Sequence, residues 1–308
     1  SRTVVEALRG SDVMRMSATA ELGGLGKTMG HMGRELEAVA TVCPSLAWTL
    51  WNHLCLFHLF VGALGPEQKP FLEGIVSGGH WVSMGAGAGS GVYGRLDGDE
   101  IVLDGRATWS TGCRYADHYG VVFAMAGDDG LPVRPLDLRF TVVRADAEGI
   151  SVEETWDGTG LRASATDDVF YRSVRVPLDR CVAWWGVNRA VELRTAPVVH
   201  HRYREDWVGL SDLWLGWMAC GVVRSAVAEA ALEARSRKVI MGRSMLDRPA
   251  IQLNIGRATA LVAAARAAVE MASIEVDRRI ETGTTPSEAR SEEHTSELQS
   301  HHDLVCRL

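Results

Sequence analysis

The segment Trp109-Ser110-Thr111-Gly112-Cys113 decides how this chain is interpreted. It lies on the far arm of a predicted β-hairpin, one turn after a run of small residues from Ser83 to Gly91. Residues two apart on a strand point the same way, so the Trp109 indole and the Thr111 hydroxyl are expected side by side. An indole can cover one face of a flat ring, and a hydroxyl can reach a nitrogen at its edge. Since glycines let a backbone approach a bulky ligand, the pattern predicts a site for a flat, polar-edged cofactor.

Length and composition predict a globular protein of more than one domain. The chain has 308 residues, of which 46% are hydrophobic and 23% charged. Its formal net charge of -7 argues against nucleic acid as a partner, because phosphate binding needs clustered lysine and arginine. The six cysteines form no C-x-x-C pair and are expected to be buried free thiols. With no secretory leader at its start, the protein is expected to be cytoplasmic.

The first part of the chain is expected to be helical. Glu35–Leu64 carries apolar residues at helical spacing, with Pro44-Ser45 as a break or a helix start, and Glu67–Ile75 predicts one more short helix. Leu46–Leu64 is apolar, but polar residues interrupt it, which favours a buried helix over a membrane span. These polar residues are Asn52, His53 and His58.

From Trp81 to about Pro177, short β-prone runs alternate with turn pairs, which predicts an antiparallel sandwich or barrel. The runs are Glu100–Leu103, Tyr119–Phe123, Leu138–Val143 and Val169–Val176. The turn pairs are Asp97-Gly98, Asp104-Gly105, Asp129-Gly130 and Asp157-Gly158. After a Trp- and Arg-rich connection, Leu210–Lys238 and Leu246–Ile280 predict two long antiparallel helices of a bundle.

The expected fold is therefore α+β and multidomain. A helical N-terminal domain spans 1–78, an antiparallel β domain spans 79–182, and an incomplete C-terminal four-helix bundle spans 183–289. Residues 290–308 are polar and aperiodic and resemble a translated sequencing adapter, so we expect a non-native tail and a truncated chain. No metal site is therefore expected from the tail residues His294, His301, His302 and Cys306.

Two glycine-rich stretches resemble phosphate-binding motifs but lack their context. Gly23–Thr28 matches the end of a P-loop, yet the required first glycine is Glu21 and no strand precedes it, so a turn between helices is expected. Gly85–Gly91 resembles a dinucleotide-binding loop, yet a hairpin follows it where that motif requires a helix.

Four motifs in a fixed order carry a family resemblance. They are Gly87-Ala88-Gly89-Ser90, then Trp109-Ser110-Thr111, then Gly160, Arg162, Ser164 and Thr166 followed by Val174-Arg175-Val176-Pro177, and last Arg237 or Lys238, Gly242 and Ala250-Ile251-Gln252. From about Gly23 to Ala289 the chain resembles the acyl-CoA dehydrogenase superfamily. The resemblance implies a helical domain, a β domain and a C-terminal four-helix bundle that hold FAD between them, with FMN as the alternative flavin.

The resemblance also implies roles for individual residues. It places Trp109 beside the flavin ring system, with the Thr111 hydroxyl near the ring nitrogen N5. The other implied cofactor residues are Ser83, Met84, Ser90, Ser110, Arg237 and Lys238, and the implied substrate residues are Ser90, Gly91 and Arg162. The chain departs from the family where T-E-P is replaced by Met84-Gly85-Ala86 and where the loop ends in Gly91 instead of aspartate. Ser83 is then the nearest substitute for the missing threonine.

Two enzyme classes share this family's fold, and both stay open. In acyl-CoA dehydrogenases a carboxylate removes the α-proton of an acyl thioester while the β-hydrogen leaves as hydride to the flavin. Asp212 is the one candidate base found here, and an ordinary helix N-terminal acid is its plainer interpretation. In two-component monooxygenases, reduced flavin and oxygen act on a small molecule, and the loop departures favour this class.

The implied partners differ between the two classes. A dehydrogenase would need an acyl-CoA and an electron-accepting flavoprotein, and a monooxygenase would need a flavin reductase. The resemblance implies a homotetramer in either case, without nucleic acid or membrane. A third interpretation is that the chain is a truncated, non-functional scaffold.

Overall fold

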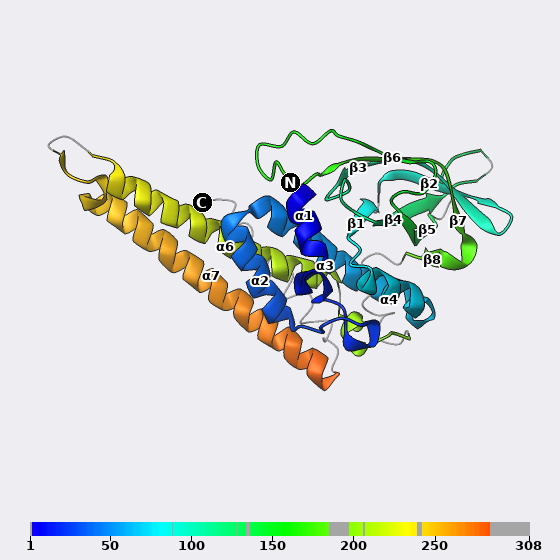
Figure 1. The fold of residues 1–308 in the computed structure, drawn as a ribbon, viewed down its shortest axis with the longest axis horizontal. Helices are drawn as coiled ribbons and strands as arrows, with labels where there is room; N and C mark the ends of the chain where they lie inside the picture. The colour runs from blue at the N-terminus through cyan, green and yellow to red at the C-terminus, as the bar shows by residue number, and fades with distance from the viewer. Residues whose placement is uncertain are drawn as a thin grey trace. The chain divides into compact units, whose positions relative to one another are not determined.

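The computed structural model describes residues 2–87, 89–127, 129–133, 136–184, 197–205, 207–238 and 242–283, and Figure 1 shows its ribbon. The chain forms two compact units. Unit 1 joins Ser1–Lys27 with Trp48–Val208, and unit 2 joins Thr28–Ala47 with Gly209–Leu308. The expected domains separate helical segments from the β segment. The two units instead combine N-terminal helices with the sheet in unit 1 and α2 with the C-terminal helices in unit 2. The tail expected over 290–308 lies outside the described residues.

The helices of unit 1 form one side of its core. They are α1 (Arg2–Arg9), α3 (Pro44–Leu64), which begins in unit 2, and α4 (Lys69–Ser77), with short 3-10 turns at Asp12–Arg15, Ala20–Leu22, Pro66–Gln68, Leu178–Arg180 and His201–Arg204. α3 begins at Pro44, which a first helical turn tolerates, so the predicted break is confirmed. α3 is long and apolar enough to cross a membrane, but 78% of its most apolar window is buried, as in a core helix.

The sheet of unit 1 is mostly antiparallel. Its strands are β1 (Val82–Ala86), β2 (Gly91–Asp97), β3 (Glu100–Ser110), β4 (His118–Met125), β5 (Leu138–Arg144), β6 (Ile150–Glu153), β7 (Asp167–Pro177) and β8 (Val182–Ala183). The order is β6-β7-β3-β2-β4-β5-β8, with β1 beside β4. The expected antiparallel β domain is confirmed as a mostly antiparallel sheet, with one departure: β4 pairs in parallel with both β1 and β2. The β2–β3 hairpin returns the chain to the side from which β4 starts, which makes these pairs parallel.

One of the predicted turn pairs lies inside a strand. Asp97-Gly98 is the turn of the β2–β3 hairpin, as predicted. Asp104-Gly105 was expected to be a second turn, but it lies within β3 at a shift in the β3–β7 register. Gly105 has φ +135°, and a Cβ there would lie 2.0 Å from the Gly91 carbonyl oxygen. The glycine is required by a close approach of two strands, not by a turn.

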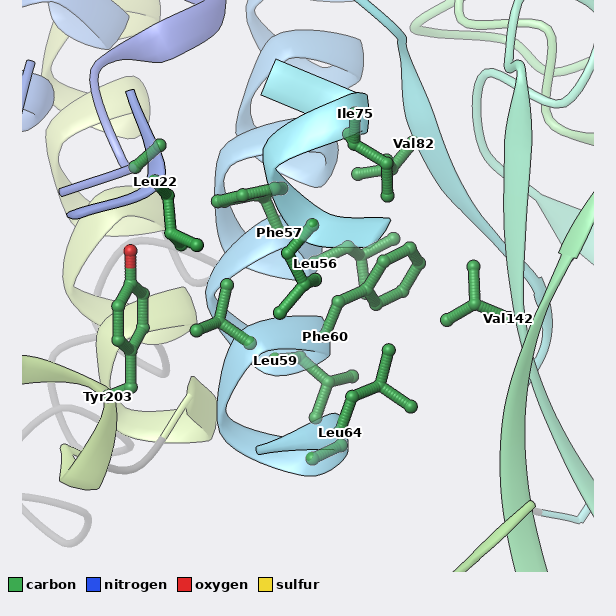
Figure 2. Close-up of a cluster of buried hydrophobic side chains, with 14 of the residues drawn as sticks. Leu22, Leu56, Phe57, Leu59, Phe60, Leu64, Ile75, Val82, Val142 and Tyr203 are labelled. Atoms are coloured by element: carbon green, nitrogen blue, oxygen red, sulfur yellow. The ribbon is translucent and has the colours of Figure 1, made fainter. Parts of the chain in front are cut away.

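Two hydrophobic clusters stabilise unit 1. One lies inside the sheet and includes Val92, Leu103, Phe123 and Tyr171, all nearly inaccessible to solvent. The other joins α3 and α4 to the sheet, and Figure 2 shows Phe60 on α3 between the helix and the strand that carries Val142. Each such side chain contributes about 1.5–3 kcal/mol of stabilisation on burial. This packing fixes α3 against the sheet, and α3 carries a residue of the candidate site.

The described part of unit 2 contains three long helices and a short turn, besides the start of α3. They are α2 (Met29–Val42), α6 (Trp207–Ser236), whose first residues belong to unit 1, and α7 (Pro249–Thr282), preceded by a 3-10 turn at Met245–Asp247. α6 and α7 run antiparallel in Figure 1, so both predicted long helices are confirmed. Trp217 Nε1 donates to Ser273 Oγ at 3.0 Å, which ties α6 to α7. α6 is also apolar enough to cross a membrane, and 22% of its apolar window is buried. The expected incomplete four-helix bundle stays a prediction.

Candidate functional site

Trp109 projects from a bulge in β3. Ala107 pairs with Val169 and Ser110 with Asp167, so two residues of β3 stand opposite one residue of β7. The extra residue forces Trp109 to a left-handed φ of +59°, and its side chain is 76% exposed. A bulky residue in this conformation is rare and costs about 1–3 kcal/mol. A large apolar side chain is thus held in solvent by a strained backbone, which is typical of a ligand-contacting position.

Trp109 and Thr111 do not lie on one face of a regular strand, as was expected. The alternation of a regular strand was expected to put both side chains on one face. The bulge interrupts that alternation, and β3 ends at Ser110, so Thr111 already belongs to the following turn. Thr111 is 8% exposed, in contrast to the open indole. The two residues remain adjacent in the chain, but a bulge and a turn place them, not strand periodicity.

The Thr111 hydroxyl is held by a buried network of hydrogen bonds. Its Oγ1 accepts from the indole Nε1 of Trp48 at 3.1 Å and lies 3.2 Å from Thr166 Oγ1. Thr166 Oγ1 in turn lies 2.7 Å from Ser164 Oγ. The motif residues Ser164 and Thr166 are therefore brought to Thr111, a contact that the sequence analysis did not predict. The sequence did not reveal Trp48, whose only sequence signal was its position three residues before Trp51 in a predicted helix.

Two serine hydroxyls fasten the end of β3 to β1. Ser83 Oγ donates to the Thr111 carbonyl, and Ser110 Oγ donates to the Gly85 carbonyl at 3.1 Å. Both serines are buried, at 0% and 3% exposure. Their hydroxyls therefore fix the backbone of the site, and a direct contact with a cofactor stays a prediction for both. Met84, which follows Ser83 in the sequence, is half-buried and packs against the core between α3, α4 and the sheet.

The glycine-rich loop leads directly into the strand next to Trp109. Gly87 and Gly89 are exposed, and a Cβ at either would meet nothing within 4 Å. Ser90 is half-buried, with Oγ 3.5 Å from the Val122 carbonyl oxygen. Gly91 begins β2 and pairs with Arg106, three residues before Trp109 on β3. The loop thus ends about one strand spacing from the Trp109 strand, with open space around it.

The segment 160–166 carries further backbone strain. Leu161 and Ala165 have φ of +51° and +49°, and with Trp109 they make three of the four non-glycine residues with positive φ among the described residues. The Gly112 N–H donates to the carbonyls of Ser164 and Ala165 at 3.0 and 2.9 Å. Strain is therefore concentrated where this segment meets the Trp109–Thr111 turn. Arg162 itself points to solvent, 76% exposed and 4.0 Å from Asp157.

Cys113 closes the turn but is not a nucleophile. Its side chain is 2% exposed, and burial raises the pKa of the thiol to about 12. A protonated thiol of this kind is inert near neutral pH. The residues of this site that can act on a ligand are therefore the indole and the hydroxyl, not the sulfur.

Comparisons with known proteins agree with this architecture. Residues 213–300 match the family model "Acyl-CoA dehydrogenase, C-terminal domain". Over 87% of its length the chain is 24% identical to indole-3-acetate monooxygenase of Pseudomonas putida and 25% identical to probable acyl-CoA dehydrogenase fadE25 of Mycobacterium leprae. The fold matches FMN-bound TdsC from Paenibacillus sp. A11-2, with a TM-score of 0.83 at 18% identity over 98% of this chain and 76% of that one.

The recognised likeness to acyl-CoA dehydrogenases is therefore confirmed for residues 213–300 by the family model, and the solved structures show the same fold for the chain. A second solved relative, XiaF from Streptomyces sp. in complex with FADH2 and glycerol, has a TM-score of 0.82 at 19% identity and covers 98% of this chain and 74% of that one. The chain spans 64% of the indole-3-acetate monooxygenase and 60% of the mycobacterial dehydrogenase.

The remaining expected site residues lie in unit 2. Asp212 is half-buried on α6, and Arg237 and Lys238 follow the end of that helix. Arg237 is exposed and pairs with Glu233 at 3.2 Å, while the Lys238 backbone forms a bridge with Ser244. Unit 2 places them on one helix and its end, and their roles toward flavin or substrate stay predictions.

The two glycine-rich stretches that resemble phosphate-binding motifs are connections between secondary-structure elements. Gly23–Thr28 lies between a 3-10 turn and α2, and Asp277 of α7 accepts hydrogen bonds from the first amides of α2. Gly85–Gly91 leads from β1 into the β2–β3 hairpin and not into a helix. Neither stretch has the form of a nucleotide-binding loop. Within the described residues no group of three or more His, Cys, Asp or Glu could hold a metal ion, and the tail histidines lie outside them.

Proposed function

We propose that this chain is a flavin-dependent oxidoreductase whose flavin lies against Trp109 and Thr111. The observation that carries the proposal is the exposed indole on a strained bulge, two residues from a hydroxyl fixed by Trp48 and Thr166. The residues present fit a flavin. The indole can cover one face of the ring system, the hydroxyl can meet a nitrogen at its edge, and the open glycine loop leaves room for the ribityl-phosphate chain.

The solved relatives support flavin as the ligand. TdsC was solved with FMN and XiaF with FADH2. FAD is our first expectation and FMN the alternative. In unit 2, Arg237 and Lys238 are the proposed phosphate contacts, because exposed basic side chains can donate charge-assisted hydrogen bonds to a phosphate. When bound, the flavin supplies a hydride acceptor or, once reduced, the electrons that activate oxygen.

The first proposed reaction is dehydrogenation of a small molecule, with an acyl thioester as the substrate class. The Thr111 hydroxyl accepts from Trp48 and has its own hydrogen to donate, which suits the edge nitrogen of an oxidised ring. The half-buried Asp212 is the proposed base for the α-proton. The match to the acyl-CoA dehydrogenase family model, which begins at residue 213, supports this class. An electron-accepting flavoprotein is the partner that it requires.

The second candidate is a two-component monooxygenase that uses reduced flavin and oxygen. The chain lacks the T-E-P of the dehydrogenase loop, having Met84-Gly85-Ala86 instead. Trp48 and Trp51 form a half-exposed pair of indoles with centroids 4.7 Å apart, directly bonded to Thr111 through Trp48. Such a pair suits a flat apolar substrate. Relatives named as monooxygenase and nitrososynthase support this class, and a flavin reductase would be its partner.

We further propose a cytoplasmic homotetramer, as the superfamily resemblance implies. The decisive experiment for function starts with the purified protein and asks whether FAD or FMN fluorescence is quenched on titration. Anaerobic bleaching of bound flavin by acyl-CoA supports dehydrogenation. Oxygen consumption that requires a separate flavin reductase supports the monooxygenase. If neither flavin binds in the oxidised or the reduced form, both enzyme proposals fail and a non-functional scaffold is left.

A further inference from the structure

Three buried hydroxyl groups form a chain that ends at Thr111. Ser164 Oγ lies 2.7 Å from Thr166 Oγ1, which lies 3.2 Å from Thr111 Oγ1. The indole Nε1 of Trp48 lies 3.1 Å from the same Thr111 oxygen. An indole N–H can only donate, so Thr111 accepts this bond with one of its two lone pairs.

Counting hydrogen atoms limits which hydroxyl group donates and which accepts in each of these hydrogen bonds. Three hydroxyls carry three hydrogens, and the two links between them use two. If Ser164 donates to Thr166 and Thr166 donates to Thr111, the spare hydrogen is on Thr111. The other arrangements leave it on Ser164 or Thr166, which are 0% and 7% exposed and have no further acceptor among the described residues. An acceptor at Thr111 therefore selects the first arrangement, because only that one uses every hydrogen.

We infer that Trp48, Thr166 and Ser164 are positioning residues that make the Thr111 hydroxyl a donor, and not an acceptor, toward the ligand ring. Trp48 and Thr166 fill both lone pairs of the Thr111 oxygen, and its single hydrogen is left for the ligand. The inference rests on the proposed function, since it takes a flavin as the ligand. It adds a role for α3, which carries Trp48, and for the 160–166 segment.

A donor-only hydroxyl distinguishes between the two redox forms of the ring. An edge nitrogen with a free lone pair, as in the oxidised form, can accept from Thr111. If that nitrogen carries hydrogen, as in the reduced form, Thr111 must accept and then donate inward. The spare hydrogen then lies on buried Thr166 or Ser164 without a partner, which is unfavourable. The network therefore favours the oxidised form.

The test removes one hydroxyl of the chain and then restores it. Thr166→Val keeps the shape of the side chain but deletes the hydroxyl, and Thr166→Ser returns it. We expect Thr166→Val to bind oxidised flavin about threefold to tenfold more weakly. If the reduced form keeps its affinity, the midpoint potential of the bound flavin rises by about 15–30 mV. Thr166→Ser should stay close to the wild type in both. Thr141→Val is the matched control. Thr141 is a fully buried threonine on β5 that takes no part in the hydrogen-bonded row of Ser164, Thr166 and Thr111.

Each outcome decides the matter. Weaker binding of oxidised flavin by Thr166→Val, with rescue by Thr166→Ser and no change in Thr141→Val, supports the inference. Wild-type affinity and potential in Thr166→Val overturn it and leave the proposed function standing. If Thr166→Val does not fold by circular dichroism, Trp48→Phe takes its place with the same expected direction, and an unchanged potential in that variant overturns the inference. If the wild type binds no flavin, the inference and the proposed function both fail.

Discussion

Ser83 holds Thr111 by its backbone: the Ser83 hydroxyl donates to the Thr111 carbonyl across the β1–β3 junction. Ser83 is fully buried, so this bond has no competition from solvent. Ser83, the nearest substitute for the threonine of the family's loop, therefore holds the backbone of the site in place. Thr111 is fixed at both ends, its hydroxyl by Trp48 and its carbonyl by Ser83.

We expect Ser83→Ala to lower the free energy of unfolding by about 1–3 kcal/mol, because a buried carbonyl loses its donor. Urea denaturation followed by circular dichroism measures the change. Ser236→Ala is the control, since its hydroxyl bonds the Glu233 carbonyl at an exposed helix end. Equal stability of the two variants would show that the Ser83 bond does not support the fold.

Trp109→Gly separates binding from stability. Glycine adopts a φ of +59° without strain, and the exposed indole contributes little burial, so the free energy of unfolding should stay constant or rise by about 1 kcal/mol. Flavin affinity should fall more than about tenfold, as one ring face loses its cover. Denaturation and fluorescence titration on the same preparation measure both quantities. A destabilised variant with intact flavin affinity would mean that the indole has a structural role instead.

His53 makes stability depend on pH. Its Nε2 donates to the Met14 carbonyl and its Nδ1 accepts from the Val82 amide, so the folded state holds the neutral ring. Burial lowers the pKa of His53 from 6.5 to about 4, although the Met14 carbonyl and Asp117 oppose this and Arg9 assists it. Between these values the unfolded chain binds more protons than the folded one, so stability is complete above pH 6.5 and is lost as the pH falls toward 4.

The expected loss from His53 alone is about 3 kcal/mol over that range. Burial also lowers the pKa of His118 to about 4, which adds a loss of the same sign. Urea denaturation at pH 7.5 and pH 4 measures the total, and His53→Gln should reduce the difference while His118 keeps part of it. A difference that is as large in His53→Gln as in the wild type would assign the effect to other groups.

Asp277 stabilises the start of α2 within unit 2. Its carboxylate accepts from the amides of Met29 at 2.6 Å and Gly30 at 3.1 Å, where the helix dipole favours negative charge. Asp277→Asn should lower the free energy of unfolding by about 1 kcal/mol, as it removes the charge and one acceptor. The exposed Glu281→Gln, one turn later on α7, is the control in the same thermal or urea measurement. Identical midpoints for the two variants would argue against this capping role.

The sequence predicted those features that depend on nearby residues. The helices either side of Pro44, the long α6 and α7, and the hairpin at Asp97-Gly98 follow from local spacing and turn chemistry. Asp104-Gly105 was misassigned because the need for glycine there comes from the Gly91 carbonyl on the neighbouring strand. An Asp-Gly pair has the same local signature in a turn and in a bulge.

The sequence singled out Trp109 and Thr111, but not the residues that surround them. Ser164 and Thr166 were recognised only as parts of another motif. The bulge that turns Trp109 outward depends on the register with β7, and Trp48 reaches Thr111 from 63 positions away in the chain. No pattern within one segment encodes either fact.

The most direct test of the account is a fluorescence titration of oxidised FAD and FMN with the wild type and with Thr111→Val. We predict that the wild type binds at least one of them. Thr111→Val should bind it about twofold to tenfold more weakly, because one hydrogen bond of about 0.5–1.5 kcal/mol is lost. Binding of equal strength by both proteins would contradict the role of Thr111, and no binding of either flavin by the wild type would contradict the account as a whole.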